Sequence, residues 1–171
     1  MDANKMREIL IEKVTVNIGV GAPGDKLEQA KSLLERLADG RTPVETHARR
    51  RDPVFKLRKG LPIGTKVTLR GEEARTFLEK AITAKRKVLK QSNFDRQGNF
   101  AFGVHEYIDF PGAKYDPAIP MFGFDICVSL SRKGRRVSLR KLKSASVGRI
   151  HRVSRDEAME FAKSFLNVKI E

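Results

Sequence analysis

Two five-residue segments combine apolar side chains with side chains that can bind phosphate and sugar. Their sequences are KVTVN at residues 13–17 and KVTLR at residues 66–70. Both alternate with period two, as half-buried β-strands do, because successive side chains in a strand point to opposite faces. The apolar face, with Val14, Val16, Val67 and Leu69, is predicted to meet the core. The opposite face contains no carboxylate and consists of Lys13, Thr15, Asn17, Lys66, Thr68 and Arg70.

Cations, hydroxyls and an amide on one strand face suit a polyanion, because these groups donate hydrogen bonds to phosphate and sugar oxygens. A solvated strand that is rich in lysine and threonine by chance remains an alternative for either segment alone. The repetition of the pattern in a chain of net charge +14 favours a nucleic acid as the partner.

A second cationic cluster lies in residues 46–70 and is predicted to form an extended basic loop that contacts RNA. Asp52 is the one acid in this segment, and the cations are Arg49, Arg50, Arg51, Lys56, Arg58, Lys59, Lys66 and Arg70. Phe55 lies among these charges. Its ring can stack on a base, or it can pack into the core, and the sequence leaves both open.

The third cluster, residues 132–152, has nine cations and no carboxylate. Like charges at this density repel one another, so we expect a basic arm that is poorly ordered alone and becomes ordered on RNA. The cations are Arg132, Lys133, Arg135, Arg136, Arg140, Lys141, Lys143, Arg149 and Arg152.

Other chemistries have less support. The sequence GVGAPG at residues 19–24 satisfies the G-x-G-x-x-G pattern of a dinucleotide site. However, the preceding strand alternates instead of being apolar throughout, and Pro23 lacks the N–H that a phosphate would need. No catalytic triad or close metal-ligand spacing is present, so we expect no catalytic residue, metal or cofactor. The single cysteine, Cys127, lies in an apolar strand pattern and is predicted to be buried.

The periodicity places these clusters on an α+β framework. Strands are predicted near residues 9–18, 44–47, 66–70, 100–104 and 124–130, and helices over residues 25–39, after Gly71 and from Ser154. Asp25 is expected to be an N-cap, and Ser154 begins a capping box. The fold class is therefore a largely antiparallel sheet with helices on one face, an extended basic loop and a basic C-terminal arm.

The length of 171 residues suits one domain, with the arm at residues 131–153 and a C-terminal helix at 154–171. The N-terminal residues 1–8 are polar and charged, without the apolar core of a signal peptide. No apolar run approaches transmembrane length. We therefore expect a cytoplasmic protein without a membrane partner.

Several motifs together resemble the fifth large-subunit ribosomal protein family, the universal family that binds 5S ribosomal RNA. They are VNIGVG at residues 16–21, GLPIGTKVTLRG at 60–71, NFD at 93–95 and GNF at 98–100. The similarity runs from about Met6 to Leu130. Beyond Leu130, the basic arm and the helix from Ser154 resemble the archaeal and eukaryotic branch of the family.

The resemblance implies a non-enzymatic role in the central protuberance of the large ribosomal subunit. Asn17 and Thr68 match family positions that contact 5S rRNA, and large-subunit rRNA is a further implied partner. The loop with Arg50, Arg51, Phe55, Lys56 and Arg58 matches the loop that reaches toward peptidyl-site tRNA. The implied protein neighbours are the eighteenth large-subunit protein and, across the subunit interface, the thirteenth small-subunit protein.

Two positions depart from the family pattern. Arg41 replaces a glutamine that contacts RNA, so donors are kept and the amide acceptor is lost. The residues Arg51, Asp52 and Pro53 replace small residues and leave the conformation of the loop tip open. Two other function classes remain as alternatives, a nucleotide-dependent enzyme using residues 19–24 and a free RNA chaperone.

Overall fold

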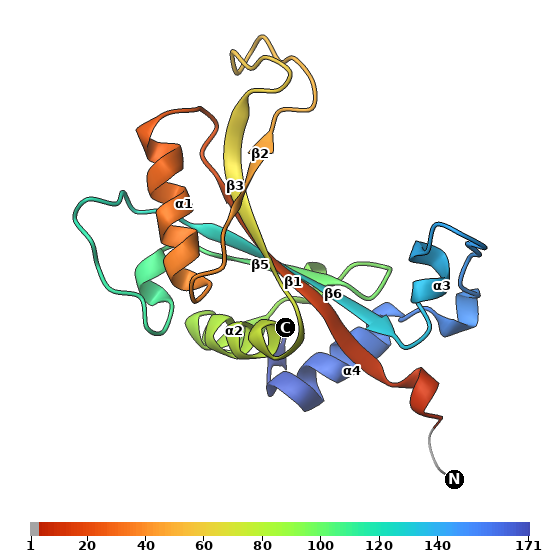
Figure 1. The fold of residues 1–171 in the computed structure, drawn as a ribbon. Coiled ribbons are helices and arrows are strands. Elements are labelled where there is room, and N and C mark those ends of the chain that lie inside the picture. Colours follow the sequence, from red (N-terminus) through yellow and green to blue (C-terminus); the bar gives the residue numbers. More distant parts are fainter. Residues whose placement is uncertain (1–3) are drawn as a thin grey trace. The chain divides into compact units, whose positions relative to one another are not determined.

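The computed structural model describes residues 4–171, so residues 1–3 of the polar N-terminal stretch lie outside the described part (Figure 1). The main element is a five-stranded antiparallel sheet with the strand order β2-β3-β1-β6-β5. Its strands are β1 (Ile9–Gly19), β2 (Val44–His47), β3 (Pro62–Leu69), β5 (Phe100–Val104) and β6 (Phe124–Arg132). A parallel pair of short strands is formed by β4 (Val88–Leu89) and β7 (Lys169–Ile170).

Residues 4–171 also contain four α-helices, which are α1 (Asp25–Leu37), α2 (Gly71–Ala84), α3 (Arg136–Leu139) and α4 (Arg155–Leu166). Short 3-10 helices are η1 (Lys5–Arg7), η2 (Gln91–Asn93), η3 (Tyr107–Asp109) and η4 (Arg149–His151). The predicted α+β class and the antiparallel sheet are confirmed.

The chain divides into two compact units. The hairpin unit consists of Thr15–Leu69 and Gly103–Ile126. The terminal unit consists of the described part of Met1–Val14, Arg70–Phe102 and Cys127–Glu171. Strands β1 and β6 contribute residues to both units. A single domain over the whole chain stays a prediction.

In the hairpin unit, α1 packs against β3 through the apolar stripe expected from its sequence. The five residues of this stripe follow the i, i+3, i+4, i+7 spacing and are all buried: Leu27, Ala30, Leu33, Leu34 and Leu37. The predicted N-cap was wrong by one residue, because Gly24 is the N-cap and Asp25 is the first helical residue. The Asp25 carboxylate still lies at the positive end of the helix dipole, where a negative charge is favourable.

The pairing of β2 with β3 decides which face of this unit is open. Val44 lies opposite Lys66 and Glu45 opposite Thr65 in the antiparallel register. Residues directly opposite share a face. Glu45 accepts a hydrogen bond of 3.2 Å from Lys31 on α1, so α1 covers the face that carries Glu45 and Thr65. Lys66 therefore lies on the uncovered face.

Gly64 allows the backbones of β3 and β1 to approach closely. A Cβ atom at this position would lie 2.7 Å from the Ile18 carbonyl oxygen and 2.9 Å from the Thr46 hydroxyl oxygen. We expect Gly64→Ala to lower the free energy of unfolding by about 1–3 kcal/mol. The Ile18 carbonyl oxygen is part of the backbone, so it cannot move away from the new methyl group unless β1 shifts. Denaturant unfolding measures this loss.

Gly19 provides a matched control for this prediction. A Cβ atom at Gly19 would meet nothing within 4 Å, and its backbone lies outside the left-handed region. Gly19→Ala should therefore change stability by less than about 0.5 kcal/mol. Equal unfolding free energies for the two variants would show that the close approach at Gly64 does not matter.

The terminal unit contains α2, α4 and most of β5. The apolar stripe of α2 is buried and consists of Ala74, Phe77, Leu78, Ala81 and Ile82. The capping box of α4 is confirmed, since Ser154 and Glu157 exchange both hydrogen bonds. The helix ends earlier than the predicted range 154–171, because Asn167 adopts a left-handed conformation with φ of 50° and β7 follows.

The buried residues of β6 follow the predicted alternation and include Phe124, Ile126, Val128 and Leu130. The prediction of a buried Cys127 was wrong, because the side chain is exposed. Cys127 lies between the buried Ile126 and Val128, so the period of two points it to the opposite face. The apolar character of a cysteine was a weaker indicator than its position in the alternation.

Candidate nucleic-acid interface

Three of the predicted RNA-binding residues line one groove in the hairpin unit. Arg41 comes from the turn after α1, and Lys66 and Thr68 come from β3. The groove has a volume of about 430 Å³, and its complete lining is Gly40, Arg41, Thr42, Val44, Lys66, Val67 and Thr68. No carboxylate is among these residues. The groove therefore offers cations and hydroxyls to an anion, and Thr42 is a member that the sequence analysis missed.

Gly40 shapes the approach of Arg41 to this groove. Its φ of 86° is in the left-handed region, and its N–H donates to the Glu35 carbonyl at the end of α1. A helix that ends in this way returns the chain sharply, as glycine commonly allows. This turn brings the Arg41 segment next to Lys66 and Thr68 of β3, although these residues are far apart in the sequence.

Thr15 and Asn17 on β1 are half-buried, and the residues between and after them, Val16 and Ile18, are buried. The alternation confirms that the two polar side chains lie on the face opposite the core. Thr15 and Asn17 therefore form a polar face on the part of β1 that belongs to the hairpin unit, as predicted.

Lys13 and Arg70 belong to the terminal unit. Lys13 is half-buried on β1, and Arg70 is exposed and immediately precedes α2. Lys13 and Arg70 are therefore not part of the groove, and their contact with RNA stays a separate prediction.

The loop between β2 and β3 extends beyond the ends of both strands (Figure 1). Its base is closed by hydrogen bonds of 2.9 Å from Ala48 N–H to Leu61 and from Gly60 N–H to Ala48. Nearer the tip, Asp52 and Leu57 exchange backbone hydrogen bonds of 3.0 and 2.8 Å. The loop is thus a narrow extension of the β2-β3 hairpin, held at two levels.

Asp52 also shapes the tip through its side chain. Its carboxylate accepts a hydrogen bond of 3.0 Å from the Val54 N–H, and Lys56 follows with φ of 55°. Aspartate commonly stabilises a turn by bonding to the backbone two residues later. The departure from the family pattern at Asp52 therefore has a structural role in the tip.

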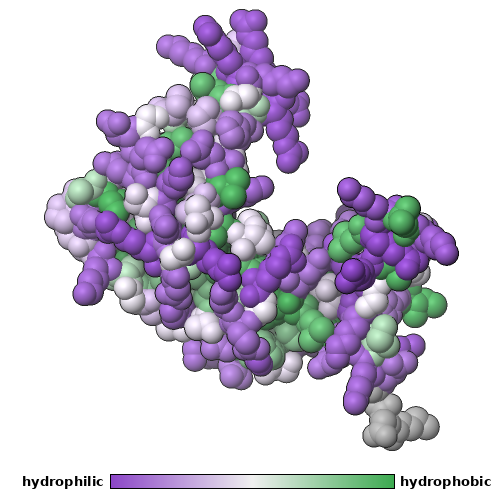
Figure 2. All heavy atoms as spheres, viewed as in Figure 1, coloured by the Kyte–Doolittle hydropathy of each residue, from purple (hydrophilic) through white to green (hydrophobic). Residues whose placement is uncertain are grey.

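The tip presents apolar as well as cationic side chains. Phe55 is 71% exposed, so its packing into the core is excluded, and Val54 is 84% exposed. The surrounding side chains of Arg49, Arg50, Arg51, Lys56, Arg58 and Lys59 are exposed. Figure 2 shows this hydrophilic cluster over the loop, with a few hydrophobic spheres among the charged ones.

The structure divides the nine cations of residues 132–152 into two groups. Three of them pair with carboxylates: Arg132 with Glu157 at 2.6 Å, Lys133 with Glu8 at 2.8 Å, and Arg135 with Glu12. In the part of the chain that the structure describes, the other six form no ion pair: Arg136, Arg140, Lys141, Lys143, Arg149 and Arg152. These six are exposed.

The ion pairs change the expected roles of the predicted arm residues. The side chain of Arg132 is 9% exposed and also donates to the Ile150 carbonyl, so its guanidinium is part of the fold. The backbone N–H of Ser154 lowers the pKa of the Glu157 carboxyl, and Arg132 lowers it further. A hydrogen bond from Lys133 lowers the pKa of Glu8. The predicted contact of Arg132 with RNA thus has a competing structural role.

Residues 131–153 are not uniformly extended. They include α3 and η4, and His151 lies 2.8 Å from the Lys133 carbonyl oxygen. Exposed apolar side chains lie among the cations, namely Leu139, Leu142 and Ile150. Whether this segment changes its order on RNA stays a prediction.

The glycine-rich turn at residues 19–24 does not have the free donors of a phosphate cradle. The N–H groups of Val20 and Gly21 both donate to the Ile63 carbonyl, at 3.0 and 2.8 Å. Among residues 4–171, no three His, Cys, Asp or Glu side chains form a group that could hold a metal ion. No helix in the same range has the length and hydropathy to cross a bilayer.

Comparison with known proteins identifies the family. The family model of ribosomal protein L5 matches residues 4–58, and the model of the C-terminus of the same ribosomal family matches residues 62–161. Large ribosomal subunit protein uL5 of Sulfurisphaera tokodaii is 49% identical over 168 residues, covering 98% of this chain and 94% of that protein. The uL5 protein of Methanococcus maripaludis is 46% identical over 168 residues, covering 96% and 92%.

The uL5 protein of Methanococcus aeolicus is 46% identical over 164 residues, covering 94% of this chain and 90% of that protein. These matches confirm the resemblance and exclude the nucleotide-dependent enzyme and the free chaperone as the main function. The chain belongs to the ribosomal protein L5 family and is a non-enzymatic protein of the large ribosomal subunit.

Proposed function

We propose that the chain binds 5S rRNA and large-subunit rRNA in the central protuberance. The observation that carries this proposal is the groove lined by Arg41, Lys66 and Thr68, whose lining residues include no carboxylate. Phosphate and 2′-hydroxyl groups are the natural ligands of such a set. Thr15 and Asn17 extend the proposed contact along β1.

The proposed mechanism separates orientation from affinity. Side chains fixed on strands and on the turn after α1 can select the shape of an RNA, because their positions are set by the sheet. The six unpaired cations of residues 132–152 neutralise phosphates and add affinity that depends on salt. These six cations are proposed to contact 5S rRNA, and large-subunit rRNA is a further candidate.

The loop between β2 and β3 is proposed to contact peptidyl-site tRNA. Support comes from the exposed Phe55 at its tip, flanked by the exposed cations Arg50, Arg51, Lys56 and Arg58. An exposed ring among cations can stack on a base or pack on a sugar. The paired backbone hydrogen bonds of Asp52 and Leu57 would hold the tip in place for this contact.

The proposed protein neighbours are the eighteenth large-subunit protein and, in an intersubunit bridge, the thirteenth small-subunit protein. A cytoplasmic location follows from the same assembly. These proposals rest on family membership and on the motifs of residues 16–21 and 60–71.

Asn17→Ala and Thr68→Ala are expected to weaken binding to 5S rRNA by roughly five- to thirtyfold each. The reason is the loss of a hydrogen bond, worth about 1–2 kcal/mol, from a side chain that lies on the uncovered face. Binding to 5S rRNA, tRNA and random RNA of equal length should be compared across a salt series. The fold should be unaffected, because neither side chain belongs to the core.

Thr76→Ala is the matched control for Thr68→Ala. Thr76 is exposed on α2 and donates only to the Glu72 carbonyl within its own helix. Its replacement should leave the affinity for 5S rRNA unchanged. Unchanged affinity in both Asn17→Ala and Thr68→Ala would overturn the proposed face.

A further inference from the structure

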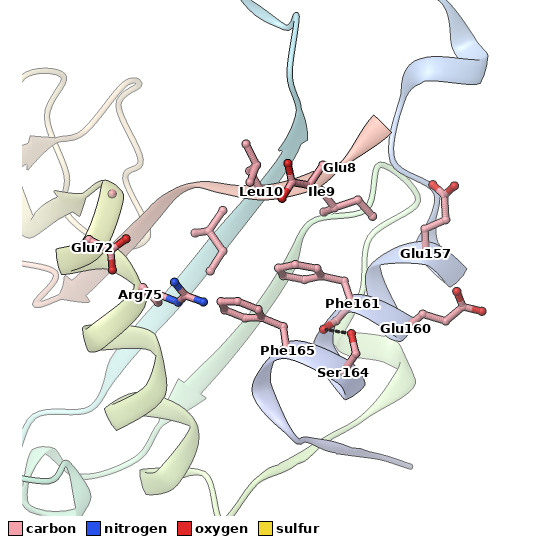
Figure 3. Close-up of a pocket in the computed structure, with 12 residues that line it drawn as sticks. Glu8, Ile9, Leu10, Glu72, Arg75, Glu157, Glu160, Phe161, Ser164 and Phe165 are labelled. Carbon is pink, nitrogen blue, oxygen red and sulfur yellow. Dashed lines mark hydrogen bonds between the residues drawn. The ribbon is translucent and has the colours of Figure 1, made fainter. Parts of the chain in front are cut away.

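A second groove, in the terminal unit, has the opposite charge to the rest of this basic chain. It has a volume of about 860 Å³ and lies between the start of β1, the first turns of α2 and the helix α4. Its lining residues come from these three elements and from Glu8, which immediately precedes β1, and Figure 3 shows them around the opening. None of the residues assigned above to RNA contact lines this groove.

The floor of the groove is apolar. The rings of Phe161 and Phe165 stack with centroids 5.0 Å apart and planes at 11°. Both rings point from α4 toward β1 and α2, and Leu10, 38% exposed, adds to this surface (Figure 3). The Arg75 guanidinium lies 4.4 Å from the Phe165 ring centroid, which is a cation–π contact.

The two rings are more exposed than the smaller residues on the same side of the helix. Phe161 and Phe165 lie on the same apolar stripe of α4 as Ala158 and Ala162, because all four follow the i, i+3 or i+4 spacing. Both alanines are fully buried, whereas both rings are only half-buried. Helix α4 therefore leaves aromatic surface uncovered beside β1.

The rim is acidic. Four carboxylates and one guanidinium line the groove, in a chain with net charge +14. Glu8 and Glu157 are paired with Lys133 and Arg132, respectively. No ion pair of Glu72 or Glu160 is formed within residues 4–171. In Figure 3, Glu72 lies on the α2 side of the groove and Glu160 on the opposite, α4 side.

We propose that this groove is the docking site for a cationic amphipathic helix of a partner protein. Apolar side chains of such a helix would cover Leu10, Phe161 and Phe165, while its lysines or arginines would meet Glu72 and Glu160. An amphipathic helix in an apolar groove is a common mode of recognition, and opposite charges at the rim set its specificity.

The charge of the rim favours a cationic helix over an RNA or a lipid surface as the occupant. Unpaired carboxylates on both sides would repel the phosphates of an RNA or an anionic lipid surface. The positive charge of the whole chain opposes the approach of any cationic peptide, so attraction must come from this local acidic rim. The proposal concerns a protein contact and does not depend on the RNA-binding proposal.

The direct test uses the full chain and a fluorescein-labelled 14-residue helix of leucine and lysine with one apolar face. Anisotropy at 0.15 M salt should show saturable binding to the unmodified protein. The double variant Glu72→Lys and Glu160→Lys should bind at least tenfold more weakly, because both rim charges change sign. Both residues are exposed, so the fold should tolerate the change.

Glu79→Lys is the matched control, since Glu79 is exposed on α2 and does not line the groove. Its affinity for the peptide should stay within twofold of the unmodified protein. The milder Glu72→Gln and Glu160→Gln double variant should give an intermediate loss. Circular dichroism would show that each variant is folded.

Two further peptides test the chemistry of the occupant. Replacing the leucines by serine keeps the charge and removes the apolar face, and replacing the lysines by glutamate keeps the face and reverses the charge. Both should bind at least tenfold more weakly than the leucine-lysine helix. Absence of binding by that helix, equal binding of all three peptides, or equal loss in Glu79→Lys would overturn the proposal.

Discussion

Replacing the six unpaired cations of residues 132–152 by glutamine is expected to lower the affinity for 5S rRNA at least a hundredfold at moderate salt. The six residues are Arg136, Arg140, Lys141, Lys143, Arg149 and Arg152. Each cation that neutralises a phosphate releases counterions, so losing six should reduce the slope of log affinity against log salt by roughly four to five. Binding measured from low to moderate salt gives this slope.

The expected loss depends on exposure as well as charge. Residues 131–153 place these six side chains at the surface without a carboxylate partner among residues 4–171. A phosphate can therefore approach them without displacing an acid. The preference for 5S rRNA over random RNA should survive the change, because the proposed shape-selecting residues lie on β1, β3 and the turn after α1.

Lys133→Gln with Arg135→Gln is the matched control. These two cations lie in the same segment and are already paired with Glu8 and Glu12. Their replacement should reduce the salt slope much less per residue than replacement of the six. An equal reduction per residue would contradict the division into paired and unpaired cations. Loss of the 5S preference in the six-residue variant would contradict the separation of orientation from affinity.

The strands with one apolar and one polar face could be predicted, because the alternation of side chains is a local property of the sequence. Val14, Val16, Val67 and Leu69 are all buried. A side chain's face follows from its position in the strand, whatever the strand packs against. The same rule corrects Cys127, whose residue type suggested burial while its position between buried neighbours required exposure.

The groove of Arg41, Lys66 and Thr68 could be predicted only in part. Each of the three residues was a candidate for RNA binding. Their position in one groove, however, depends on how the turn after α1 returns to β3. That return depends on the backbone of Gly40 and on the packing of α1, neither of which is a spacing in the sequence. Thr42 gave no signal of its own for the same reason.

The ion pairs of the basic segment could not be predicted from the pattern. Lys133 pairs with Glu8 and Arg135 with Glu12, which lie 125 and 123 residues earlier in the chain. The sequence shows nine equivalent cations, and only the tertiary fold selects three of them for pairing. The half-burial of Phe161 and Phe165 also depends on the tertiary fold, because a helical stripe indicates which face is apolar and not whether it is fully covered.

Glu157→Ala is expected to lower the free energy of unfolding by about 2–3 kcal/mol, a large loss of stability for a single residue. The Glu157 carboxylate accepts hydrogen bonds from the Ser154 N–H at 2.9 Å and from Arg132 at 2.6 Å. Its removal leaves the guanidinium of Arg132, 9% exposed, without a counter-charge. The expected loss lies below the range for a fully buried pair, because Glu157 is 40% exposed.

The two partners should respond unequally to replacement. Arg132→Met leaves Glu157 in contact with water and with Ser154, so we expect a loss of only about 1 kcal/mol. In the double variant Arg132→Met and Glu157→Ala, no buried charge is left unpaired, and stability should recover relative to Glu157→Ala. Glu160→Ala, on the same helix without an ion pair within residues 4–171, should change stability by less than about 0.5 kcal/mol.

The pH dependence gives an independent check. The folded-state pKa of Glu157 is lowered, so its contribution is fully present above the unfolded-state pKa of about 4.3 and is lost as the pH falls below it. The difference in unfolding free energy between the unmodified protein and Glu157→Ala should therefore be constant at neutral pH and shrink in acid. A difference that stays constant through this range would mean that Glu157 acts through packing alone. Additive losses in the double variant would mean that Arg132 and Glu157 stabilise the terminal unit independently of each other.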